Sequence, residues 1–153
     1  MKLMNVLLVA ALGLAMPLMA GDAASEALVA AATKQVGVIT PKALKKMIDN
    51  EDDVTMLDVR DPFMREEGNI EGMENVALSR GNLEFEIGKE ISDKNTFIVV
   101  YCRSGKFAAL AAKTLVDDFH YKNVHILEGG IDGWLEAGYS IFNHFGEVQL
   151  VKE

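Results

Sequence analysis

Cysteine is scarce in this chain of 153 residues, which contains one, Cys102. A disulfide within the chain is therefore excluded, and so is disulfide exchange by a cysteine pair, because no second thiol can resolve the mixed disulfide. Histidine is also scarce: His120, His125 and His144 are scattered and lack the H-x-x-x-H spacing of a metal site. The sequence predicts no metal site.

A dinucleotide-binding loop is missing as well. Gly129 and Gly130 follow an apolar run, but the glycines around them lack the G-x-G-x-x-G spacing that such a loop needs. Without metal ligands or a nucleotide motif, no cofactor is expected.

Positive charge is in short supply. The 15 lysines and arginines are outnumbered by 23 aspartates and glutamates, which gives a formal net charge of −8. An acidic chain without a basic stripe does not suit nucleic acid or an anionic membrane surface. Neither is expected as a partner.

Charged residues are missing from the N-terminal segment between Lys2 and Asp22. One early positive charge, an apolar stretch and then small residues are typical of an export signal. We expect residues 1–20 to be a signal peptide cleaved between residues 20 and 25, and the protein to be exported, most simply to a bacterial periplasm. An uncleaved anchor is the alternative, because the uncharged stretch is long enough to span a bilayer. After cleavage, no membrane span would remain.

Apolar residues are abundant and make up 50% of the chain, which suffices for one core. We expect residues 21–35 to form a leading helix or arm, residues 36–145 one domain, and residues 146–153 a C-terminal tail. Apolar runs typical of buried strands occur at 36–40, 55–60, 75–79, 96–101 and 123–127.

Helical patterns alternate with these runs, and the first begins at Pro41 behind the N-cap residue Thr40. Strands that are apolar throughout and alternate with helices indicate a parallel sheet covered on both faces. The predicted fold class is α/β, with one parallel sheet of about five strands and flanking helices.

Cys102 directly follows the most apolar of the runs, so it falls at the carboxyl edge of the predicted sheet, where ligands bind in such folds. Gly105 permits a backbone bend, and the following helix N-terminus adds partial positive charge. Arg103 and Lys106 add full charges nearby, and all these effects favour the reactive thiolate. The alternative is a small buried cysteine beside two solvated loop charges.

Three segments resemble the rhodanese family of sulfurtransferases and occur in the family's order. YCRSGKFAALAAKTL (101–115) resembles its active-site loop and following helix. Residues 57–76 resemble its D-V-R … G-H-I-x-G-A-x-N segment, and residues 127–141 its closing L-x-G-G-x-x-x-W-x-x-x-G element. The matching positions outside the loop are Asp58, Val59, Arg60, Gly68, Ile70, Gly72, Asn75, Leu127, Gly129, Gly130, Trp134 and Gly138.

This resemblance implies a rhodanese-like fold and a catalytic Cys102 that carries sulfur as a persulfide. The substrate-binding loop would then consist of Arg103, Ser104, Gly105, Lys106 and Phe107, with Asp58 and Arg60 as structural support near the site. The implied reaction moves sulfur from a small anionic donor such as thiosulfate to cyanide or a thiol, and a protein could serve as the acceptor.

The sequence departs from the family at Asn69, Arg65 and Phe107, where histidine, an aromatic residue and a polar residue are usual. We expect the first two to affect structure more than chemistry, because their segment is far from Cys102 in sequence. An aromatic Phe107 makes the pocket mouth more apolar, which suits a larger or thiol-bearing partner.

The alternatives to a sulfurtransferase are a phosphatase and a non-catalytic module. A related phosphatase branch needs an arginine six residues after the cysteine, and that position is Ala108. A non-catalytic binding or sulfur-carrier module is typical of relatives that have lost the cysteine, whereas Cys102 is retained. Sulfur transfer is therefore the favoured function.

Overall fold

The computed structural model describes residues 20–71 and 73–150 of the chain. The predicted signal segment lies outside the described residues except for Ala20. Within the described part, no helix is both long and apolar enough to cross a membrane.

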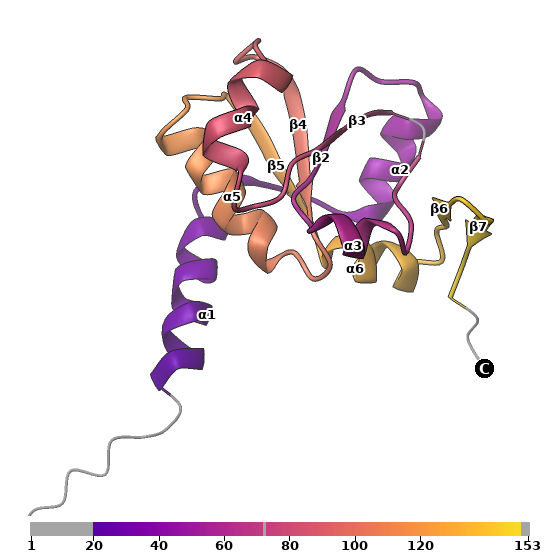
Figure 1. The fold of residues 1–153 in the computed structure, drawn as a ribbon, viewed down its shortest axis with the longest axis horizontal. Coiled ribbons are helices and arrows are strands. Elements are labelled where there is room, and N and C mark those ends of the chain that lie inside the picture. The colour runs from indigo at the N-terminus through magenta and orange to yellow at the C-terminus, as the bar shows by residue number, and fades with distance from the viewer. Residues whose placement is uncertain (1–19, 72, 151–153) are drawn as a thin grey trace, which may run out of the picture.

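A five-stranded parallel sheet forms the centre of the molecule, in the order β1-β5-β4-β2-β3 (Figure 1). The α/β class and the number of strands predicted from the sequence are confirmed. The strands are β1 Gly37–Ile39, β2 Thr55–Asp58, β3 Glu74–Ala77, β4 Phe97–Tyr101 and β5 Asn123–Leu127.

Helices cover both faces of this sheet, with α4 and α5 on one side and α2 on the other (Figure 1). The long helix α5 follows β4 directly, as the sequence pattern predicts. The helices are α1 Ala20–Thr33, α2 Pro41–Asp49, α3 Pro62–Arg65, α4 Leu83–Glu90, α5 Lys106–Asp117 and α6 Gly130–Glu136.

The Thr40 hydroxyl accepts a hydrogen bond from the Ala43 N–H at 3.2 Å, and Pro41 is the first residue of α2. The cap satisfies a backbone donor that the helix itself leaves unpaired, while proline has no donor to lose at this position. The predicted start of α2 is therefore confirmed.

Side chains of β4 alternate between two cores, because successive strand residues point to opposite faces of a sheet. Ile98 and Val100 pack with α4 and α5, and Cys102 continues this series on the same side. Val99 and Tyr101 pack on the other side, in the core with α2 and α6. The alternation decides that Cys102 faces the α5 side.

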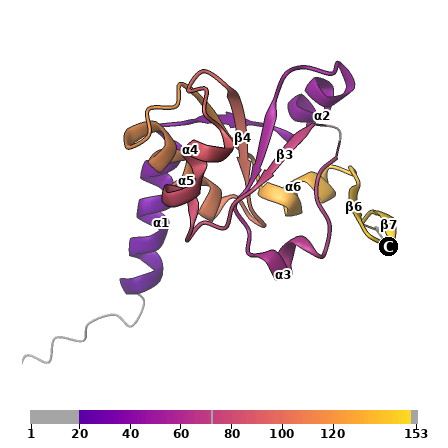
Figure 2. The same cartoon turned by 45° about the horizontal axis from the view of Figure 1, so that its top comes forward.

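Two elements lie at the margins of the molecule. Helix α1 packs through Val29 and Ala32 against the α5 side, and the rest of it extends away from the body (Figure 2). At the other end, β6 Ile141–Asn143 pairs with β7 Gly146–Val148 in an antiparallel hairpin. The segment expected to be a C-terminal tail thus includes a strand.

Candidate active site

Cys102 lies where three parallel strands end side by side. In the sheet register, Asp58 at the end of β2 is paired with Tyr101 of β4 and with Ala77 of β3. The residues that follow these strands therefore meet at one edge, which is where open parallel sheets bind ligands. Sequence positions more than 40 residues apart become neighbours there.

The loop after Cys102 bends back toward the sulfur. Gly105 has a positive φ of 88°, which glycine adopts without a steric penalty, and its N–H donates to Cys102 Sγ at 3.2 Å. Helix α5 begins at the next residue, Lys106. The sulfur thus faces a backbone donor and a helix N-terminus, both of which stabilise negative charge.

Lys106 and Phe107 are the first two residues of α5, so the structure places them in the helix and not in the loop. The connection from β4 to α5 therefore comprises four residues, Cys102 to Gly105. Within it, Arg103 and Ser104 are exposed to solvent, whereas Cys102 is buried.

The start of α6 holds the other side of this loop. The Ile131 N–H donates to the Cys102 carbonyl at 3.0 Å, and the Asp132 N–H donates to the Arg103 carbonyl at 3.0 Å. Gly130 lies so close that a Cβ built on it would be 2.4 Å from the Cys102 oxygen. These bonds hold the first two loop carbonyls on α6.

A pocket of about 210 Å³ opens onto the cysteine, whose residue is only 3% exposed. The pocket is lined by residues that follow β2, β3 and β4. They are Val59, Arg60, Asp61, Met64, Arg80, Gly81, Cys102, Arg103 and Phe107. Cys102 is therefore recessed, and a molecule must enter the pocket to contact it.

Asp58 and Arg60 form a buried ion pair in the wall of the site, with Arg60 Nη2 at 2.7 Å from Asp58 Oδ2. The same guanidinium donates to the carbonyls of Met64 and Gly68, at 3.1 and 2.8 Å. Burial opposes the charged form, but the Asp58 carboxylate holds the pKa of Arg60 above its ordinary value. With its hydrogen bonds directed at the protein, this arginine positions the 60–68 segment.

Arg80 and Arg103 are the other cationic side chains that line the pocket. Arg80 is 31% exposed, and it is oriented by Glu84 Oε1 at 2.7 Å and Thr114 Oγ1 at 3.3 Å. Arg103 is 57% exposed and lies 3.6 Å from both Glu67 and Asp132. Arg80 is therefore the less exposed of the two and is the one held by side-chain hydrogen bonds.

Tyr101 precedes Cys102 but lies on the other face of the sheet. Its hydroxyl is buried without a hydrogen-bond partner among the described residues. Burial, followed by the nearby Asp58 carboxylate, raises the pKa of Tyr101 well above its ordinary value. The side chain thus packs the α2 side and does not supply a proton to the cysteine pocket.

Arg80, Gly81 and Met64 were not expected at the site from the sequence. Arg60 was expected near the site, and it lines the pocket together with its neighbours Val59, Asp61 and Met64. Distance from Cys102 along the chain therefore does not exclude a residue from the pocket. The strand order explains the position of these residues. Strand β2 lies between β4 and β3, so the residues that follow all three strands reach the same edge of the sheet.

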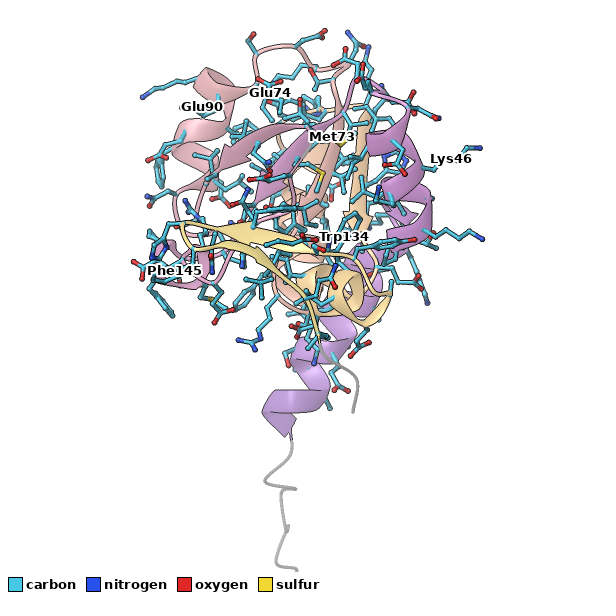
Figure 3. The ribbon with its side chains drawn as sticks, turned by 90° about the vertical axis from the view of Figure 1, so that its right-hand side faces the viewer. Lys46, Met73, Glu74, Glu90, Trp134 and Phe145 are labelled. Carbon is cyan, nitrogen blue, oxygen red and sulfur yellow. The ribbon has the colours of Figure 1, made fainter. Side chains whose placement is uncertain are left out.

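A larger pocket of about 480 Å³ lies elsewhere, and its lining includes Glu74 and Glu90. These two side chains are labelled in the upper part of Figure 3, and the two pockets have no lining residue in common. The described residues contain no group of three histidine, cysteine or acidic side chains arranged to hold a metal ion.

An open parallel sheet whose carboxyl edge carries a recessed cysteine, followed by a helix N-terminus, defines an α/β protein with a cysteine at the edge where such sheets bind ligands. Comparison with known proteins identifies the family within that class. Residues 40–137 match the family described as Rhodanese-like domain, and the chain belongs to this family.

Three relatives illustrate the match. The thiosulfate sulfurtransferase GlpE of Pseudoalteromonas translucida (strain TAC 125) is 35% identical over 96 residues, which cover 62% of this chain and 84% of the relative. The polysulfide-sulfur transferase homodimer of Wolinella succinogenes superposes with a TM-score of 0.66 at 32% identity, covering 86% of this chain and 92% of that one.

The third relative is a Rhodopseudomonas palustris CGA009 protein of unknown function, described as a possible tyrosine phosphatase. It has a TM-score of 0.62 and 31% identity, and the match covers 76% of this chain and 92% of that one. In the present chain, Ala108 stands where a phosphatase loop would place its arginine, and it is buried within α5. The pocket therefore lacks that phosphate ligand.

The packing of Gly130 against the loop leads to a stability prediction. We expect Gly130→Ala to lower the free energy of unfolding by about 3 kcal/mol, because the new Cβ would strain a positive φ and also overlap loop backbone. Gly138→Ala is the matched control, since Gly138 also has a positive φ but nothing within 4 Å of a Cβ. Gly138→Ala should lower the free energy of unfolding by only about 1 kcal/mol, as measured by urea unfolding of both variants. Equal losses would contradict the close packing.

Proposed function

We propose that this protein is a sulfurtransferase in which Cys102 accepts a sulfane sulfur as a persulfide and passes it to a nucleophile. The observation that carries the proposal is the recessed Cys102 sulfur, which receives the Gly105 N–H at 3.2 Å beside a pocket lined by arginines. Such a site favours a sulfur anion and an anionic reactant together.

In the first step, the Cys102 thiolate attacks the outer sulfur of thiosulfate. A sulfur–sulfur bond forms at Cys102, the bond within thiosulfate breaks, and sulfite leaves with the electron pair. The persulfide that remains carries one negative charge. The Gly105 N–H and the N-terminus of α5 face this group and stabilise that charge.

In the second step, an acceptor nucleophile attacks the outer sulfur of the persulfide. With cyanide the product is thiocyanate, and with a thiolate it is a new persulfide, while Cys102 leaves as the thiolate in both cases. The chain has no second cysteine to attack the persulfide, so the acceptor comes from outside.

Support for the donor comes from the relatives and the pocket. One relative is named for thiosulfate and another for polysulfide, and both compounds present a sulfane sulfur to a nucleophile. Arg80 and Arg103 give the pocket the positive charge that suits such anions.

Persulfide formation is the first test. Incubation of the purified protein with thiosulfate should add one sulfur atom by intact mass, and cyanide should then remove it as thiocyanate. Cys102→Ser should do neither, because a hydroxyl cannot form the persulfide. Thiocyanate production by the serine variant would assign the reaction elsewhere. Absence of an adduct on the wild-type chain would favour a binding module.

Arg80 leads to a second prediction about the donor. We expect Arg80→Gln to raise the KM for thiosulfate about tenfold, because a charge-assisted contact in a partly buried pocket is lost. Arg103→Gln is the matched comparison, and about a twofold effect is expected because the Arg103 side chain is 57% exposed, against 31% for Arg80, so solvent screens its charge more strongly. Steady-state kinetics with thermal unfolding as a folding control measures both. Equal KM values for the two variants would contradict the role of Arg80.

We also propose that the protein is exported, with residues 1–20 removed as a signal peptide. Support comes from the uncharged stretch between Lys2 and Asp22 and from the small residues that follow. N-terminal sequencing of protein from the cell envelope of a bacterial host should begin between residues 20 and 25. An intact Met1 in a membrane fraction would instead identify an anchor.

A further inference from the structure

An apolar groove lies next to the cysteine pocket and has no role in the reaction described above. It encloses about 220 Å³ between α1 and the first turns of α5. Its lining consists of Ser25, Glu26, Leu28, Val29, Lys106, Phe107 and Leu110. The groove and the cysteine pocket share one residue, Phe107, which lines both.

The groove is exposed although much of its wall is apolar. Leu28 and Phe107 are 62% and 61% exposed, respectively, whereas Val29 beside Leu28 helps to attach α1 to the core. The fold therefore does not need the Leu28 side chain for its own packing. An exposed apolar surface that is continuous with a reactive site indicates a binding surface.

The two small reactants of the proposed reaction do not account for this surface. Thiosulfate and cyanide are small anions, and an apolar groove offers them no favourable contact. A reactant that uses both cavities must place a nucleophile near Cys102 and an apolar group beyond Phe107. The recessed position of Cys102 further requires that the nucleophile project from its carrier into the pocket.

A cysteine in an extended polypeptide segment meets these requirements. Side chains two residues apart on such a segment point to the same side and are about 7 Å apart. A thiol could then enter the cysteine pocket while an apolar neighbour occupies the groove. Arg103 and Arg80 at the pocket would favour the acceptor in its thiolate form.

We propose that the groove between α1 and α5 binds a large apolar side chain two residues from the acceptor cysteine of a partner protein. This proposal rests on the sulfurtransferase function. The partner thiolate attacks the outer sulfur of the Cys102 persulfide, a sulfur–sulfur bond forms on the partner, and the bond to Cys102 Sγ breaks. Cys102 leaves as the thiolate, so no external oxidant or reductant is needed.

The test uses the persulfide form of the full exported chain and two synthetic pentapeptides, which have either leucine or serine two residues after a cysteine. We expect the KM for the leucine peptide to be about tenfold lower than for the serine peptide. Leu28→Ser should abolish that preference. Leu150→Ser is the matched control, because Leu150 is 52% exposed and does not line the groove, and it should keep the preference.

Persulfide loading and transfer to cyanide should be unchanged in Leu28→Ser, since Leu28 does not line the cysteine pocket. Equal KM values for both peptides, or a preference retained by Leu28→Ser, would overturn the docking proposal. A dimer of the wild-type chain that Leu28→Ser converts to monomer in light scattering would also overturn it, because a second copy would then occupy the groove. Failure to load sulfur at all would instead overturn the sulfurtransferase function.

Discussion

The reactive geometry depends on one backbone constraint, the contact between the Cys102 loop and the start of α6. Two N–H groups of α6 bind the carbonyls of Cys102 and Arg103, and Gly130 allows the two backbones to approach closely. Because these carbonyl oxygens are held on α6, the loop can direct the Gly105 N–H toward the sulfur. The carbonyl ends of two peptide dipoles are thus directed at α6, while the N–H end of another faces the Cys102 sulfur.

The three arginines of the pocket differ in burial and in what they contact. Arg60 is buried, and its guanidinium is directed at Asp58 and two backbone carbonyls, so it organises the wall of the pocket. Arg80 and Arg103 line the pocket from positions more open to solvent. This division explains how a chain with a net charge of −8 can still have a pocket lined by arginines.

Most of the fold was predictable, because its signals are local. The apolar β4 segment, the cap at Thr40 and the glycine before α5 each determine structure within a few residues. The proposed roles of Asp58, Arg60 and the residues from Cys102 to Phe107 remain predictions. Arg80 and Met64 were missed because only the strand order brings the ends of β2 and β3 beside β4. Phe107 was noted for its apolar character, but its position between two cavities requires α1 to pack on α5.

By itself, the sequence determined that the chain has one cysteine and no second thiol, and that this cysteine follows a buried strand at the edge of a parallel sheet. These properties follow from residue counts and from apolar patterns that bury strands locally. Only the tertiary structure decided how far the sulfur is recessed, which arginine is buried and which lines the pocket, and what lies beside Phe107. Those properties depend on strand order and helix packing between residues distant in sequence, and no local pattern specifies such contacts.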